Sequence, residues 1–185
     1  VIDAPVFLSG LAAFAAGTAL LVLRGLLASP LGGARLDGAG ALRFGINASL
    51  VACAVALLAF AWSFAAVPRA LEPRAYYELA FWGGGHVLQF AWTLLLLVAW
   101  LVLADASGLR VPISPRVVTL LFALQLVAVF ATTLVYLAFD VTSVEHHRLQ
   151  TWLMRIGGTI AIPVVAAAIA VGYARRDRTA PMPSA

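Results

Sequence analysis

The chain has 185 residues, of which 63% are hydrophobic and 11% are charged, and its mean hydropathy is +1.00. A water-soluble domain of this length carries about 25% charged residues, so this composition would leave a soluble surface apolar and prone to aggregation. All 12 basic residues are arginine, and with 8 acidic residues they give a net charge of +4. Because the arginines lie at the ends of apolar runs, we interpret them as orientation signals in a membrane and not as a nucleic-acid-binding surface.

Five apolar runs are long enough to cross a hydrocarbon core about 30 Å thick, which takes roughly 20 helical residues. In chain order they cover about 6–28, 44–67, 77–104, 117–139 and 151–173. Pro163 lies inside the fifth run, where its missing N–H predicts a kink. The connections are too short to form another domain. The sequence therefore predicts an all-α, polytopic membrane bundle of five transmembrane helices over residues 1–174, with a polar cytoplasmic tail over 175–185.

The arginines near the ends of these runs predict the orientation. With the N-terminus outside, the cytoplasmic set is Arg24, Arg35, Arg43, Arg110, Arg116, Arg175, Arg176 and Arg178, and the outer set is Arg69, Arg74, Arg148 and Arg155. Cytoplasmic loops carry the excess of basic residues in membrane proteins. We therefore expect an outer N-terminus and a cytoplasmic C-terminus, in a multi-pass protein of a bacterial inner membrane.

All three histidines fall on the outer side in this orientation. His86 lies in the third run near its outer end, and His146 and His147 lie in the outer connection before the fifth run. Imidazole is the commonest metal ligand, so the set predicts a candidate copper, zinc or haem site. The alternative for the pair is ordinary exposure at the interface, whereas His86 must face protein or a cavity because an ionisable group at membrane depth is costly.

Three consecutive glycines, residues 83–85, precede His86 in the third run. Glycine in a helix costs about 1 kcal/mol relative to alanine. We therefore expect this segment to admit close approach, either of a neighbouring helix or of a flat cofactor ring. Gln89 follows His86 by one turn and is a candidate cofactor-site residue, because its amide could bond to the second ring nitrogen of His86 or to a partner helix.

Two further candidates come from the fourth and fifth runs. The fourth run carries the polar side chains Gln125, Thr132, Thr133 and Tyr136. Interhelical hydrogen bonding is their default role, and a proton path is the alternative. Arg155 begins the fifth run, where we expect it to pair with Glu145, with Asp140 or with an anionic group such as a haem propionate, or else to snorkel to the interface.

The segment from Tyr76 to Phe90, YYELAFWGGGHVLQF, resembles the sixth helix of haem–copper oxidase subunit I, in which an aromatic-rich approach and Gly-His carry the first copper-ligand histidine. That family has a His-His pair one helix hairpin later, where this chain has His146 and His147. The resemblance implies copper ligation by these three histidines. It also implies that the five runs correspond to the fourth to eighth helices of that subunit.

The resemblance also departs from the family pattern. Phe90 stands where some members carry a tyrosine cross-linked to the first histidine, and Tyr136 is the candidate replacement from the next helix, as in one class of the family. The interval from His86 to His146 is longer than the family usually has. No counterpart of the helices that carry the haem-ligand histidines occurs in the 185 residues, so the implied contribution is the copper half of the site.

These observations leave three hypotheses about function. The first is a haem–copper-oxidase-like subunit of a respiratory complex that reduces oxygen or nitric oxide, with other membrane subunits as partners. The second is a non-catalytic accessory or scaffold subunit that packs through its glycine faces. The third is a small transporter or channel, against which the few membrane-embedded charges and the lack of an inverted repeat both argue.

Overall fold

The computed structural model describes residues 4–28 and 36–176, and helices account for most of them. In chain order these are α1 (Pro5–Ala28), α2 (Gly38–Ala66), α3 (Pro73–Ala106), α4 (Pro115–Ala138), α5 (Val144–Leu153), the π-helix η1 (Met154–Gly158) and α6 (Ala161–Ala174). Within the described ranges, α1 to α4 and the combined stretch Val144–Ala174 are long and apolar enough to cross a membrane. The predicted all-α bundle of five spans is therefore confirmed. The predicted tail falls largely on residues 177–185, outside the described ranges.

Two helices begin several residues before the apolar runs predicted for them, because a polar residue caps each N-terminus. α2 begins at Gly38 and not near residue 44, since the carboxylate of Asp37 accepts the N–H of Gly40 at 2.7 Å. α3 begins at Pro73 and not near residue 77, since Glu72 caps it. Proline suits the first helical position because its missing N–H would have no partner there.

The fifth span shows the largest difference from the prediction. α5 begins at Val144, where residue 151 was expected, because the hydroxyl of Ser143 accepts the N–H of His146 at 3.1 Å. The prediction that His146 and His147 lie in a connection is therefore wrong. Both belong to the first turns of α5.

The same span is interrupted near the predicted kink. η1 follows α5 directly, and α6 begins only at Ala161. In a regular helix Pro163 would clash with the carbonyl of Thr159, four residues earlier, and could not donate to it. The N–H of Ile162 bonds to that carbonyl instead, at 3.0 Å. The irregularity thus lies one turn before the proline.

α2 and α3 make the most extensive contact of the bundle, and α2 also packs against α4. The buried face of α2 carries small residues at intervals of three and four, as one face of a helix requires. They are Gly45, Ala48, Ala52, Ala56, Ala59 and Ser63. Small side chains let helix backbones approach closely, which is a main source of helix association in lipid.

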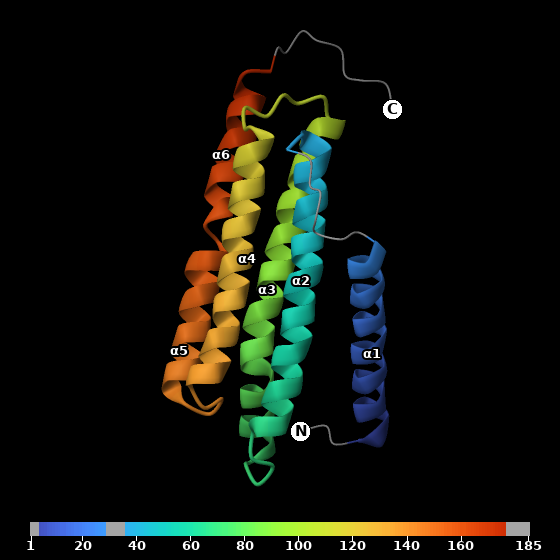
Figure 1. The fold of residues 1–185 in the computed structure, drawn as a ribbon, viewed down its shortest axis with the longest axis vertical. Helices are drawn as coiled ribbons and strands as arrows, with labels where there is room; N and C mark the ends of the chain where they lie inside the picture. Colours follow the sequence, from blue (N-terminus) through green and yellow to red (C-terminus); the bar gives the residue numbers. More distant parts are fainter. Residues whose placement is uncertain (1–3, 29–35, 177–185) are drawn as a thin grey trace.

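The arrangement of the spans sets the ends of the bundle (Figure 1). α5 and α6 run in line beside α4, and α1 lies at the edge, packed on α2 near Gly25 and Leu50. The N-terminus of α3 and the connection from α4 to α5 lie at the same end, at the bottom of Figure 1. We call this the histidine end, because His86, His146 and His147 lie towards it.

Candidate functional site

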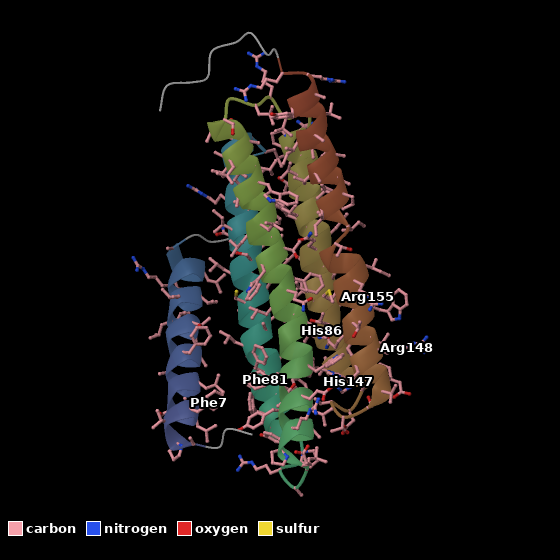
Figure 2. The ribbon with its side chains drawn as sticks, turned by 180° about the vertical axis from the view of Figure 1, so that it is seen from behind. Phe7, Phe81, His86, His147, Arg148 and Arg155 are labelled. Atoms are coloured by element: carbon pink, nitrogen blue, oxygen red, sulfur yellow. The ribbon has the colours of Figure 1, made fainter. Side chains whose placement is uncertain are left out.

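The structure brings the three histidines together at one end of the bundle, two of them against Trp82 and the third beside His147. The ring centroid of Trp82 lies 4.8 Å from that of His86 and 5.0 Å from that of His147. The ring of His146 lies 5.9 Å from that of His147. We call these four side chains, which come from α3 and α5, the histidine cluster. Figure 2 shows His86 and His147 towards the histidine end of the bundle.

Two of these histidines have their tautomers set by the backbone. Nδ1 of His86 lies 2.7 Å from the carbonyl oxygen of Trp82, and Nδ1 of His147 lies 2.8 Å from that of Ser143. A carbonyl only accepts, so in both rings Nδ1 carries the proton and donates. Nε2 is then left with its lone pair. Metal-ligating histidines in proteins commonly have this pattern, with the distal nitrogen free and the other bonded to a carbonyl.

His146 is the most unusual member of the histidine cluster. Its side chain is 0% exposed, and neither ring nitrogen has a hydrogen-bond partner among the described residues. A buried donor without a partner costs about 1–3 kcal/mol. Such a group therefore needs an explanation, for which a bound ligand or an ordered water is the usual choice.

Tyr136 packs against His146 and not against the first histidine of the cluster. Its ring lies 4.7 Å from that of His146 in an edge-to-face arrangement, and its hydroxyl is 3.0 Å from Ser63 on α2. The ring has room because residue 83 is glycine: a Cβ there would lie 2.0 Å from the Tyr136 hydroxyl. Tyr136 thus connects α2, α3, α4 and α5 at this end of the bundle.

The three glycines that precede His86 have different surroundings. Gly83 faces Tyr136 and His146, Gly84 faces the ring of Phe60, and a Cβ on Gly85 would meet no atom within 4 Å. Of the two expected uses, close packing within the chain accounts for the first two. In the described structure, side chains of the same chain therefore occupy the space expected for a flat cofactor.

Gln89 does not bond to His86, so that prediction is wrong. Its side chain is exposed and bonds to no other helix among the described residues. Nε2 of His86 instead lies 3.4 Å from the hydroxyl of Thr151, which also donates to the carbonyl of His147 at 2.9 Å. Sequence reasoning missed Thr151. The sequence feature that could have identified Thr151 is its spacing of four residues from His147, which places both residues on one face of α5.

Of the roles expected for Arg155, pairing with Glu145 or Asp140 is wrong. Arg155 lies in η1 and is exposed, and its side chain pairs with neither Glu145 nor Asp140. Asp140 is bonded instead by the hydroxyl and the N–H of Thr142, at 2.5 and 2.7 Å. These bonds hold the pKa of the Asp140 carboxyl below its ordinary value. The carboxylate therefore stabilises the connection before α5.

Two buried amides lie behind the histidine cluster. Gln150 donates to the carbonyl of Thr132 at 3.3 Å, and Gln125 donates to the carbonyl of Gly158 in η1 at 3.2 Å. Their side-chain oxygens are buried without partners in the described structure. The side chain of Gln125 thus takes the predicted interhelical role, as does the Tyr136 hydroxyl, whereas the hydroxyl of Thr132 donates to Val129 within α4. Gln150 was missed, although it follows His146 by four residues and shares its helix face.

The chemistry of the donor set fits a transition metal, but the spacing falls short of a ready site. Neutral imidazole suits copper and zinc. Among residues 4–28 and 36–176, however, no group of three His, Cys, Asp or Glu side chains is placed to hold a metal ion. One ion would be held by all three histidines only if their rings turned towards a common point.

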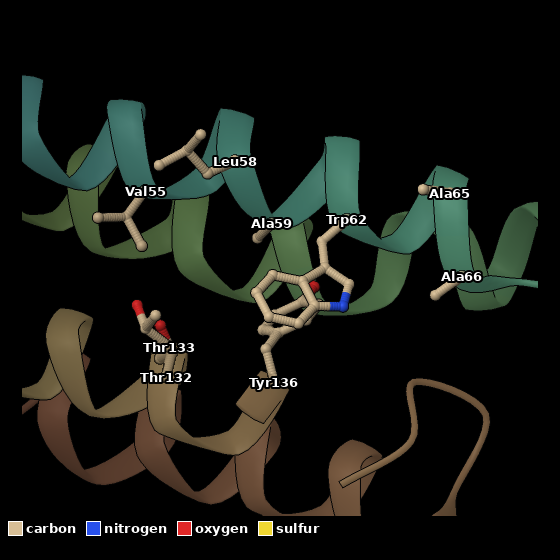
Figure 3. Close-up of a pocket in the computed structure, with 9 residues that line it drawn as sticks. All are labelled: Val55, Leu58, Ala59, Trp62, Ala65, Ala66, Thr132, Thr133 and Tyr136. Atoms are coloured by element: carbon tan, nitrogen blue, oxygen red, sulfur yellow. The ribbon is translucent and has the colours of Figure 1, made fainter. Parts of the chain in front are cut away.

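A groove of about 670 Å³ opens between α2 and α4 beside Tyr136. Its lining is mostly apolar and includes Leu58 and Trp62 on α2, with Thr132 and Thr133 on α4. In Figure 3 the indole of Trp62 lies next to Tyr136 and the two threonines face the groove from α4. The groove therefore leads from the lipid-facing surface to the tyrosine that packs on His146.

The fold and these contacts define a multi-pass helical membrane protein with a polar cluster at one end. The chain is 27% identical over 124 residues to an uncharacterized protein of Rickettsia prowazekii (strain Madrid E). The match covers 63% of this chain and 24% of that protein, so the chain spans about a quarter of the length of the relative it matches. No protein-family model matches the chain. No solved structure matches it significantly.

Proposed function

We propose that this chain is a membrane-embedded part of a respiratory electron-transfer subunit of the haem–copper oxidase type, in a bacterial inner membrane. In this proposal His86, His146 and His147 bind copper near the outer face. A copper ion bound there would supply a centre for one-electron transfer and for binding oxygen or nitric oxide, as the family resemblance implies.

One observation carries the proposal: α3 and α5 bring all three histidines into one cluster, His86 and His147 against Trp82 and His146 beside His147, with ring nitrogens available. Nε2 of His86 and Nε2 of His147 are left with lone pairs, because Nδ1 donates to a carbonyl in each ring. His146 is buried with both nitrogens unpartnered in the described structure. A set of imidazoles in this condition suits a metal better than a packed core, in which buried polar groups are normally bonded.

The other residues would position the ligands. Thr151 of α5 contacts α3 through Nε2 of His86, while its bond to the carbonyl of His147 fixes its own position on α5. The ring of Tyr136 packs against the ring of His146, and a hydrogen bond with Ser63 holds the Tyr136 hydroxyl in place. Residues of this kind keep ligand rings oriented, and their removal typically weakens metal affinity by about 10–100-fold.

Metal analysis of the purified protein tests the proposal. Wild-type protein in detergent, loaded with copper and dialysed, is expected to retain one copper per chain, and both His86→Ala and His147→Ala are expected to lose it. Gln89→Ala is the matched control on α3, since its side chain is exposed and bonds to none of the histidines. The proposal is refuted if wild-type protein does not retain copper, or if both histidine variants retain as much copper as wild type does.

A non-catalytic accessory subunit is the second candidate. It is favoured by the spacing of the cluster, since within the described ranges no three His, Cys, Asp or Glu side chains are placed to hold a metal ion. This candidate predicts that His86→Ala leaves both copper content and complex activity unchanged, whereas Gly84→Leu, which would collide with Phe60, prevents assembly. The two candidates are thus separated by the same histidine variant.

A further inference from the structure

An arginine lies on the surface of the bundle at the depth of the membrane core. Arg155 is exposed and belongs to η1, well inside the fifth span. Two residues later, a Cβ on Gly157 would lie 2.4 Å from the Cβ of Ala128 and 3.3 Å from the ring of Phe90. Ala128 and Phe90 are close to the midpoints of α4 and α3. Arg155 therefore lies about 3 Å along the helix axis from the middle of two neighbouring spans.

Snorkelling does not bring this guanidinium to water. A hydrocarbon core about 30 Å thick extends about 15 Å from its midplane, and an extended arginine side chain reaches only about 6–7 Å. The surface is also apolar on both sides of Arg155. Leu149 and Trp152 are 37% and 50% exposed towards the histidine end, and Ile156 and Ile160 are 60% and 45% exposed in the other direction.

The described part of the chain offers Arg155 no counter-charge. Its side chain makes no ion pair or hydrogen bond there. The acidic residues in those ranges lie in connections or within two turns of a helix end: Asp37, Glu72, Glu78, Asp105, Asp140 and Glu145. The described residues of a second copy in the same orientation would bring no carboxylate to this depth either. Charged residues inside a membrane normally pair within protein.

We propose that this surface is the docking face for a transmembrane helix of a separate subunit, and that the helix carries an aspartate or glutamate level with Arg155. We define the Arg155 face as the exposed stripe Leu149, Trp152, Arg155, Ile156, Ile160 and Val164. In Figure 2 the side chains of Arg155 and Arg148 both point away from the bundle on this side.

The chemistry of the face matches such a partner. The planar guanidinium makes paired hydrogen bonds with a carboxylate, and these are strongest where water is excluded. The apolar side chains of the face lie at intervals of three and four residues, which is the spacing that packs against another helix. The face is built on η1, and single-turn π-helical segments of this kind frequently occur at functional sites.

Photo-crosslinking in native membranes tests the proposal. A photoreactive amino acid is placed at Trp152 or Ile160, on the Arg155 face, and at Trp92, which is 67% exposed on α3, as the control position. We expect the first two positions to crosslink to a transmembrane helix of another protein that has Asp or Glu within one turn of the crosslinked residue. Crosslinks to lipid alone, to a second copy of this chain or to a helix without an acidic residue would overturn the proposal.

Charge variants then show whether Arg155 makes the contact. Arg155→Leu is expected to reduce the crosslink about tenfold or more, and exchanging the charges, with Arg155→Asp here and arginine in place of the partner's carboxylate, is expected to restore it. Arg148→Leu, nearer the start of α5, is the matched control and should leave the crosslink intact. An unchanged crosslink in Arg155→Leu, with an unchanged Tm, contradicts the proposal. Copper content is expected to be the same in all these variants, so this proposal and the proposed function fail separately.

Discussion

Gly83 is the position where the packing of the histidine end can be tested most directly. A Cβ there would lie 2.0 Å from the Tyr136 hydroxyl oxygen, 2.8 Å from its Cζ and 3.1 Å from Cε1 of His146. The tyrosine has little room to retreat, because Ser63 holds its hydroxyl and His146 lies against its ring. We expect Gly83→Ala to cost about 1–3 kcal/mol through overpacking, offset by about 1 kcal/mol of helix propensity.

The net expectation is a loss of up to about 2 kcal/mol in the free energy of unfolding. Gly85→Ala is the internal control: its Cβ would meet no atom within 4 Å, so it should gain up to about 1 kcal/mol from propensity alone. Both are measured by equilibrium unfolding in detergent micelles, with helix content as the signal.

A double-mutant cycle with Tyr136→Phe shows whether the contact with the hydroxyl is responsible. Phenylalanine removes the closest atom, so Gly83→Ala should cost less in that background, with an interaction energy of at least about 0.5 kcal/mol. The reasoning is refuted if Gly83→Ala stabilises the protein as much as Gly85→Ala does. It is also refuted if the cost is the same with and without the hydroxyl.

Two further predictions concern hydrogen bonds. Ser63→Ala removes the interhelical hydrogen bond of the buried Tyr136 hydroxyl and should lower the free energy of unfolding by about 1 kcal/mol, whereas Ser49→Ala, which removes only a bond within α2, should change it much less; equal effects would contradict this. The pKa of the Asp140 carboxyl is lowered by its bonds from Thr142, so its stabilisation is present above the unfolded-state pKa and is lost as the pH falls through the folded-state pKa. Asp140→Asn should therefore show a smaller drop in Tm below about pH 4 than wild type does. The same decrease of Tm with falling pH in both proteins would contradict this prediction.

The histidine end shows where reasoning from the sequence succeeds and where it stops. Counting spans placed His86, His146 and His147 at one end of the bundle, because alternation across a membrane follows from the number of crossings alone. Their neighbours were not predictable in this way. The contacts of Trp82 with His147 and of Tyr136 with His146 depend on how the helices rotate and tilt against one another, and packing between helices decides that.

The fifth span shows a signal that was present in the sequence and was not used. Ser143 with Glu145 in the next turn is a typical helix start, and it places the beginning of α5 at Val144. The apolar run begins only near residue 151, because the first turns of α5 carry the polar pair His146 and His147. Hydropathy therefore placed Arg155 at the interface, although it lies eleven residues inside the helix.

The sequence by itself determined that this protein crosses a bilayer five times as helices, because unsatisfied backbone groups are costly in lipid and each apolar run has the necessary length. Only the tertiary structure decided which side chains meet. It placed Trp82 against His86 and His147, buried His146 with no hydrogen-bond partner among the described residues, and put Arg155 on an apolar surface near the level of the midpoints of α3 and α4. The reason is physical: the length of a span is set by the bilayer and can be read locally, whereas the rotation and depth of each side chain are set by contacts between helices distant in the chain.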